Sequence, residues 1–171
     1  MRNPRDFFKP MAIDAREPLR EIPFKASRLI HFVDAYQDDD ALTIAELWAF
    51  PTMLRLACLE LLVTAFGRLL PELEAPFAPT PLAAALDSLE ATECVARALA
   101  NLGVIASIPW KDFFVQTSRV EAILCGDPAG VYARMDFETR DRYRRVVEDL
   151  ASGSARSEGE VANHAIARAR D

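Results

Sequence analysis

The fold of this chain is decided by one stretch, residues 43–70, which reads TIAELWAFPTMLRLACLELLVTAFGRLL. Its apolar residues recur three and four positions apart, which is the spacing of one face of an α-helix. The first four residues, Thr43 to Glu46, form a capping-box pattern, in which the threonine hydroxyl and the glutamate carboxylate each accept a hydrogen bond from a backbone N–H. The stretch therefore predicts a long helix that begins beside Thr43 and packs in a core.

Pro51 interrupts this predicted helix about one and a half turns after its start. Proline has no N–H to donate to the carbonyl of Leu47, so the helix must kink there or restart with Pro51 in its first turn. Charged residues also break up Leu42–Leu70, whereas a membrane span needs about 20 predominantly apolar residues. We expect a proline-kinked central helix in a core, and a chain that does not itself span a membrane.

Helical spacing continues on both sides of the central helix. The chain has only six glycines, and no stretch alternates apolar and polar residues as a strand would. We expect an all-α fold, a single-domain helical bundle of about six helices over residues 25–171, with a flexible N-terminal arm at residues 1–24. The other predicted helices cover residues 25–37, Pro81 to a stop at Gly103, Pro109 to Leu124, Asp136 to Ser152 and a short one from Ser157, and a proline-rich crossover fills residues 71–81.

Composition and charge exclude several classes of function. The chain has 171 residues, which suits one globular domain with a real core. Lys and Arg number 20 against 26 Asp and Glu, for a net charge of -6. A field of this sign repels nucleic acid and anionic lipid, so we expect no nucleic-acid partner.

The three cysteines, Cys58, Cys94 and Cys125, are far apart and flanked by apolar residues. An odd number at this spacing does not make a disulfide framework or a metal site, and the flanking residues predict inert core thiols. The charges and prolines of the first 18 residues do not fit an export signal. We expect a cytoplasmic protein.

Catalytic signatures are missing from the sequence. No Walker or GxGxxG loop, GxSxG elbow or HExxH helix is present, so no cofactor or metal is predicted and the chain is not expected to be catalytic alone. His31 and His164 fit exposed helix positions better than catalytic ones. The run Asp38–Asp40 could bind a divalent cation, but no strand precedes it to hold the carboxylates, and a solvated loop is the simpler interpretation.

A group of five arginines lies near the C-terminal end of the chain, at positions 134, 140, 142, 144 and 145. Acidic residues are interleaved with them, and Glu138 with Arg142 and Asp141 with Arg145 have the four-residue spacing of helical ion pairs. A solvated, salt-bridged helix face is therefore favoured over a phosphate site. Trp48, Phe50 and Trp110 could stack on a sugar ring, although such residues more often anchor a core or an interface.

Four stretches of the sequence carry a resemblance to a known family. They are VDAYQ (residues 33–37), LTIAELWAFPTMLRL (residues 42–56), WKDFF (residues 110–114) and DPAGVYARMDFETRDRYRRVVEDLA (residues 127–151). The string DPAGVYARMDFETRDRYR within the last stretch is too long and too irregular to follow from helix composition alone. The four stretches resemble the non-catalytic N-terminal region of bacterial cyclic β-1,2-glucan synthases, which are large inner-membrane proteins, and the resemblance implies that a partner could hold the chain at the inner face of the inner membrane. The resemblance covers roughly residues 29–170.

The resemblance implies a place in a polypeptide that builds cyclic β-1,2-glucan from UDP-glucose through a glycosyltransferase domain and a phosphorylase-like domain. Neither domain is visible in this sequence, so no catalytic residue is carried over. The implied role is a helical scaffold whose partners are the transferase and phosphorylase parts, with β-1,2-glucan as a further possible ligand.

Two functional hypotheses follow, from different classes. The chain could be an accessory domain that docks through an exposed patch at Trp48, Pro51, Arg55 and Tyr132. Alternatively, it could be a fragment that contributes Arg134, Asp136 and Arg140 to a glucan channel. A small dimeric regulator unrelated to glucan is the third possibility. An exposed apolar patch favours docking, and a groove with aromatic and charged residues favours glucan.

Overall fold

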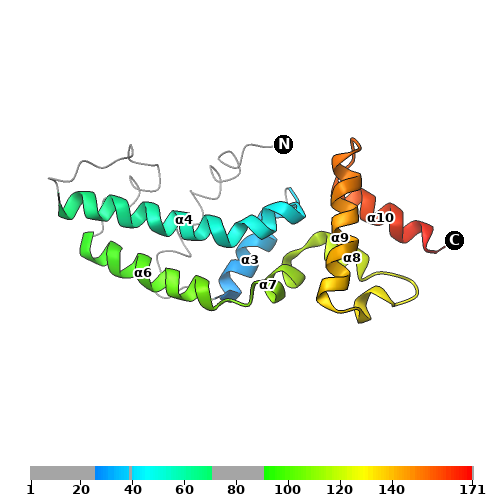
Figure 1. Ribbon diagram of the computed structural model, residues 1–171, viewed down its shortest axis with the longest axis horizontal. Helices are drawn as coiled ribbons and strands as arrows, with labels where there is room; N and C mark the ends of the chain where they lie inside the picture. Colours follow the sequence, from blue (N-terminus) through cyan, green and yellow to red (C-terminus); the bar gives the residue numbers. More distant parts are fainter. Residues whose placement is uncertain (1–25, 39, 71–90, 171) are drawn as a thin grey trace. The chain divides into compact units, whose positions relative to one another are not determined.

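The computed structural model describes residues 26–38, 40–70 and 91–170 (Figure 1). These residues form seven α-helices and one short 3₁₀ helix, with no strand among them, so the all-α helical bundle is confirmed. The arm at 1–24, the crossover at 71–81 and the predicted helix start at Pro81 lie outside the described residues. The helices are α3 (Ala26–Tyr36), α4 (Ile44–Leu69), α6 (Ala91–Ser107), α7 (Trp110–Thr117), α8 (Arg119–Leu124), η1 (Tyr132–Arg134), α9 (Phe137–Ser152) and α10 (Glu158–Arg168).

Three predicted helix starts are confirmed by their caps. Glu46 N donates to Thr43 Oγ1 at 3.2 Å, and Thr43 N donates to Glu46 Oε2 at 2.9 Å, which completes the capping box before α4. The same reciprocal pair joins Ser157 and Glu160 at α10. At α9 the carboxylate of Asp136 accepts from Thr139 N at 2.8 Å. Each cap satisfies backbone donors that have no partner inside the helix.

Two predicted helix boundaries are wrong. Gly103 does not end α6, which continues to Ser107, because one glycine weakens a helix interior by only about 1 kcal/mol. The predicted helix from Pro109 to Leu124 is two helices, α7 and α8. Ser118 separates them because its extended backbone and its hydroxyl, which accepts from Glu121 N at 3.2 Å, form a new N-cap.

The contacts divide the chain into two compact units. Among the described residues, unit 1 comprises 26–31, 50–70 and 91–109, and unit 2 comprises 32–38, 40–49 and 110–170. In unit 1 the main part of α4 runs beside α6 (Figure 1), and the charge of Arg68 near the end of α4 acts on the thiol of Cys94 at the start of α6. The core of this unit includes Leu54, Cys58, Leu61, Ala65, Cys94, Ala98 and Ile105.

Asn101 is the polar exception in the core of unit 1. Its side chain is fully buried, and neither its amide nitrogen nor its amide oxygen has a hydrogen-bond partner. A buried polar group without a partner keeps its desolvation cost. We therefore expect Asn101→Leu to raise the free energy of unfolding by about 1–2 kcal/mol, measured by urea denaturation followed by far-UV circular dichroism. The matched control is the exposed Asn163→Leu, which should change little; a destabilised Asn101→Leu chain would contradict the prediction.

Pro51 lies inside α4 and is buried, where its missing N–H removes one helical hydrogen bond. A kink at this position stays a prediction. By length and composition α4 could cross a membrane, a property that core helices of soluble proteins share. The expectation that the chain does not span a membrane likewise stays a prediction.

Unit 2 is built from the end of α3, the start of α4 and helices α7 to α10. Two hydrogen bonds connect distant parts of its sequence. Gln37 Nε2 donates to the carbonyl of Thr117 at 2.9 Å, and Ile44 N, at the start of α4, donates to Glu158 Oε2 on α10 at 2.8 Å. Both bonds link the first segment of the unit to the C-terminal helices. The buried apolar residues include Val33, Leu42, Leu47, Phe113, Phe114, Val120, Leu124, Val147 and Ala162.

Candidate functional site

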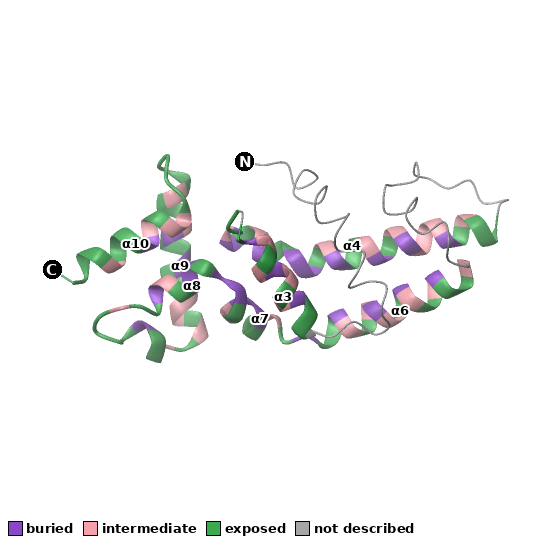
Figure 2. Cartoon of the chain, turned by 180° about the vertical axis from the view of Figure 1, so that it is seen from behind, coloured by how far each residue is buried: buried purple, intermediate pink, exposed green. Residues whose placement is uncertain are grey.

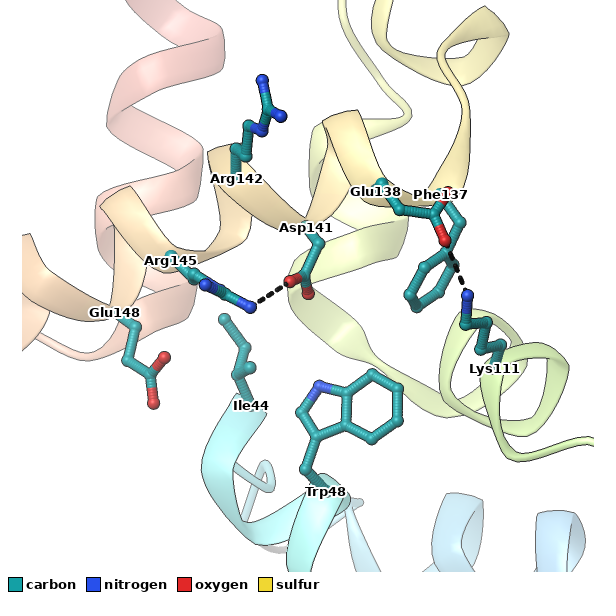
Figure 3. A pocket seen from close by; sticks show the side chains of 9 residues that line it. All are labelled: Ile44, Trp48, Lys111, Phe137, Glu138, Asp141, Arg142, Arg145 and Glu148. Carbon is teal, nitrogen blue, oxygen red and sulfur yellow. Dashed lines mark hydrogen bonds and ion pairs between the residues drawn. The ribbon is translucent and has the colours of Figure 1, made fainter.

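An open pocket of about 530 Å³ lies in unit 2 between the start of α4, the start of α7 and one face of α9 (Figure 3). The residues from α9 recur with each helical turn: Phe137, Asp141, Arg145 and Glu148 are four, four and three positions apart, and Glu138 and Arg142 lie beside them, so all border one side of the helix. Apolar and charged side chains meet in this pocket, and the charges are three positive and three negative. The lining residues are Ile44, Trp48, Lys111, Phe137, Glu138, Asp141, Arg142, Arg145 and Glu148.

Trp48 is the largest apolar group in the pocket, and 37% of its surface is exposed. Its indole stacks on the buried ring of Phe114, with centroids 4.8 Å apart and planes 11° apart, and meets Phe137 edge-on at 6.1 Å. The stacking covers one face of the indole. Trp48 is thus held rigidly by the core while more than a third of it stays open to a ligand or partner.

Four of the six charged side chains that line the pocket form two ion pairs. Lys111 Nζ lies 2.6 Å from Glu138 Oε1, and this hydrogen bond lowers the pKa of the Glu138 carboxyl. Lys111 also lies 4.9 Å from the centroid of Phe137, within range of a cation–π contact. On the other side, Arg145 donates to Asp141 at 3.0 Å. These four charged groups are neutralised in pairs, so they give the pocket little net field.

Arg142 and Glu148 are different, because neither has an ion pair or side-chain hydrogen bond among the residues that the structure describes. They lie on α9 six residues apart, too far along the helix to pair in the manner of i,i+4 neighbours. In Figure 3 Arg142 extends from the side of α9 that faces away from Trp48 and Ile44, whereas Glu148 extends from the side on which Ile44 lies. The pocket therefore offers one carboxylate beside the exposed part of Trp48, and one guanidinium lies at its rim.

A buried ionic cluster lies behind the pocket and fixes the position of α9. Glu121 on α8 is 1% exposed, and its carboxylate accepts from Arg144 at 2.6 Å, from Arg140, and from the Tyr132 hydroxyl at 2.8 Å. Arg144 is fully buried, and its guanidinium also contacts the rings of Phe114 and Phe137 and donates to Asp141 at 3.2 Å. We call these four residues, Glu121, Tyr132, Arg140 and Arg144, the Glu121 cluster. Through Asp141 it is connected directly to the pocket.

The protonation states of Tyr132 and Arg144 are set by their burial and by the hydrogen bonds and charge of Glu121. Burial and the hydrogen bond to Glu121 raise the pKa of Tyr132, so its hydroxyl stays protonated and donates. Burial disfavours the charged guanidinium of Arg144, but the hydrogen bond and charge of Glu121 outweigh it and raise the pKa of Arg144. The cluster therefore holds a carboxylate against two guanidinium cations and a neutral phenol.

A short loop between α8 and η1 brings Tyr132 to Glu121. The carboxylate of Asp127 accepts from the backbone N–H groups of Ala129 at 3.1 Å, Val131 at 2.8 Å and Tyr132 at 3.2 Å. These bonds lower the pKa of Asp127. Gly130 takes a φ of 60°, which an L-residue rarely adopts, so the glycine is needed for this turn. The DPAG sequence thus has a structural role.

The residues that the sequence predicted as one exposed binding patch do not form such a patch in the structure. Trp48 alone of them lines the pocket. The prediction that Pro51 and Tyr132 are exposed is wrong: both are buried, Tyr132 because its hydroxyl pairs with Glu121 and its ring meets Tyr143. Arg55 is exposed but belongs to unit 1.

The residues proposed for a glucan channel also have other positions. Asp136 caps α9, and Arg140 pairs with Glu121, while Arg134 is exposed in η1 and does not line the pocket. The prediction of a wholly solvated arginine face is wrong for Arg144, which is buried. The helical face of Glu138, Asp141, Arg145 and Glu148 could have been found from its spacing, but its partner Lys111 lies 27 residues before Glu138.

Other candidate groups stay outside the pocket. His31 and His164 are exposed. Asp38 forms an ion pair with Arg119, in which its Oδ1 lies 3.5 Å from a guanidinium nitrogen. Within residues 26–38, 40–70 and 91–170, no group of three His, Cys, Asp or Glu side chains could hold a metal ion.

The three thiols differ in exposure, although the pKa of each is raised, that of Cys125 by burial and then by the charge of Glu121. Burial raises the pKa of Cys58 to about 11, and Cys94 is buried as expected, with its pKa also raised by burial. Cys125 is exposed, which makes the prediction of a third core thiol wrong. Gly126 follows it, and α8 has ended by that point, so Cys125 lies on a turn and not on a packed face.

Comparison with known proteins gives no relative: no family model, no curated protein and no solved structure matches the chain.

Proposed function

We propose that the chain is a non-catalytic helical scaffold and interaction domain of a cyclic β-1,2-glucan synthase. In this proposal other parts of the synthase carry out the polymerisation of UDP-glucose, and the transferase or phosphorylase part is the docking partner. One observation carries the proposal. All nine residues that line the pocket of unit 2 belong to the three stretches 42–56, 110–114 and 127–151, which resemble that family.

The chemistry of the pocket fits a protein segment as its occupant. Trp48 supplies the exposed apolar surface, since Ile44 is only 4% exposed, and a partly exposed, rigidly held tryptophan is a common anchor of protein interfaces. Arg142 and Glu148 have no ionic partner in the described part of the chain, so they can pair with an acidic and a basic side chain of the incoming segment. The docking surface is therefore Trp48, Arg142 and Glu148.

The test is a binding measurement between the full chain and the purified remainder of a cyclic β-1,2-glucan synthase. The double variant Arg142→Ala with Glu148→Ala keeps the net charge and should raise the Kd about tenfold or more. The control double variant Arg134→Ala with Asp149→Ala removes one exposed charge of each sign outside the pocket. An equal effect of the two double variants, or no binding of the unaltered chain, would count against the proposal.

Glucan binding in the same pocket is the second candidate, and the exposed part of Trp48 favours it, because sugar rings stack on aromatic faces. Calorimetry with linear β-1,2-glucan separates the two candidates. Heat that disappears in the Arg142→Ala and Glu148→Ala double variant and persists in the control would make glucan the ligand. No heat, together with binding to the synthase remainder, would leave docking as the function.

A further inference from the structure

The part of α4 that belongs to unit 1 carries two apolar rows. The first row is buried and consists of Leu54, Cys58, Leu61 and Ala65. The second, which we call the outer row, consists of Leu56, Leu59, Val63 and Phe66 on α4 and of Leu70, which directly follows the helix and whose N–H donates to the carbonyl of Phe66 at 2.8 Å. Four of these side chains are 46–50% exposed, and Val63 is half-buried. Figure 2 shows exposed and intermediate segments alternating with buried ones along α4. Exposed apolar side chains in a continuous row mark an interaction surface.

The spacing of the outer row identifies the kind of partner it suits. Its residues are separated by three, four, three and four positions, which is the heptad spacing of helices that pair side by side. Successive helical residues are about 100° apart, so this row lies on the far side of α4 from the buried row. A second helix with the same spacing could pack along it for two heptads.

Two charged residues flank the outer row and indicate that the partner helix is a second α4. Arg55 precedes Leu56 and is exposed, and Glu60 follows Leu59 and is half-buried. They lie on opposite sides of the row, and neither has an ion pair among the described residues. In a parallel pair of identical helices, the residue before one heptad position lies against the residue five later on the other helix. Arg55 of each copy would therefore meet Glu60 of the other.

We propose that the outer row of α4 is a homodimer interface, at which two copies of this chain pair in parallel through Leu56, Leu59, Val63, Phe66 and Leu70. Two Arg55–Glu60 ion pairs, related by the two-fold axis, flank this seam. The acidic Glu60 beside the seam favours a protein partner over a lipid bilayer, where an ionised carboxylate is costly. This interface is in unit 1 and does not depend on the proposed function of the pocket in unit 2.

The first test is the molar mass of the full chain by sedimentation equilibrium. We expect a dimer, and we expect Leu59→Glu with Phe66→Glu to raise its dissociation constant about a hundredfold or more, because two seam side chains on each copy become charged. The control is Val146→Glu with Leu150→Glu, which makes the same chemical change at two exposed positions of α9. It should leave the dimer intact. Circular dichroism on both variants checks that the helices persist.

Charge exchange tests the parallel arrangement. Arg55→Glu alone and Glu60→Arg alone should each weaken the dimer a few-fold, because each places like charges in contact on both sides of the seam. The double variant Arg55→Glu with Glu60→Arg should restore the dissociation constant of the unaltered chain. Failure of the double variant to restore it would overturn the parallel pairing.

A disulfide cross-link tests the parallel arrangement independently of the charge exchange. In a Cys125→Ser background, which removes the exposed thiol, Leu56→Cys should form an intermolecular disulfide under mild oxidation, since position 56 meets itself only in a parallel pair. A chain that stays monomeric at all concentrations would overturn the proposal. If that monomer binds phosphatidylglycerol vesicles and Leu59→Glu with Phe66→Glu abolishes the binding, the outer row is instead a lipid-binding surface.

Discussion

Replacing Arg144 by alanine should lower the free energy of unfolding of unit 2 by about 3–5 kcal/mol. The guanidinium is fully buried and donates to Glu121 and Asp141, while it also lies over the rings of Phe114 and Phe137 at 5.0 and 4.6 Å. Its removal leaves a buried carboxylate with one cation fewer and opens a cavity between two aromatic rings. Both effects lower the free energy of unfolding of unit 2.

The unfolding of unit 2 can be followed separately. The chain has two tryptophans, Trp48 and Trp110, and both belong to unit 2, so tryptophan fluorescence during urea denaturation measures this unit. The matched control is Arg145→Ala, next in sequence, whose side chain is 73% exposed and pairs with the same Asp141. Its loss should change the free energy of unfolding by about 0.5 kcal/mol or less. Equal effects of the two variants would contradict the structural role of Arg144.

The second large effect is expected for Glu121→Gln, a change that keeps the shape of the side chain and removes its charge. Arg144 then keeps only Asp141 as an anionic partner, and Arg140 loses its carboxylate. We expect a loss of about 3 kcal/mol in the free energy of unfolding of unit 2, by the same fluorescence measurement. Glu138→Gln is the control, because its ion pair with Lys111 is exposed and its loss should change the free energy of unfolding far less than the loss of the Glu121 charge.

A double-variant cycle separates the ion pair from general loss of packing. If Glu121 and Arg144 stabilise unit 2 mainly through each other, the pair of changes Glu121→Gln and Arg144→Ala should cost at least about 1 kcal/mol less than the sum of the single changes. Additive losses would show that the two side chains act independently, and would refute the view of the cluster as one ionic unit.

Local signals in the sequence are sufficient for three of the helix starts of this chain. The caps at Thr43, Asp136 and Ser157 depend on residues three positions away, so they can be recognised without any tertiary structure. The predicted end of α6 is wrong because it relied on Gly103 as the stop signal. A glycine is a weak stop, and Pro109 after Ser107 is the stronger signal.

The candidate site could be predicted only in part, because its determinants are distant in sequence. Spacing places Asp141 and Arg145 on one face of α9, and their ion pair is confirmed. Spacing also predicted a pair between Glu138 and Arg142, but Glu138 pairs with Lys111 on α7. The burial of Arg144 was likewise not predictable. Its anionic partner Glu121 lies 23 residues earlier, and a single sequence does not show that the two side chains meet in the core.

The exposed thiol of Cys125 offers a practical handle for solution work. Cys58 and Cys94 are buried and Cys125 is exposed, so a maleimide dye should attach first at Cys125, without any engineering of the sequence. The pKa values of all three thiols are raised, so the selectivity comes from exposure. The sulfur lies 3.8 Å from a carboxylate oxygen of Glu121. A fluorophore at this position would consequently sense the polarity beside that carboxylate, and its emission could follow the loss of the Glu121 cluster during unfolding.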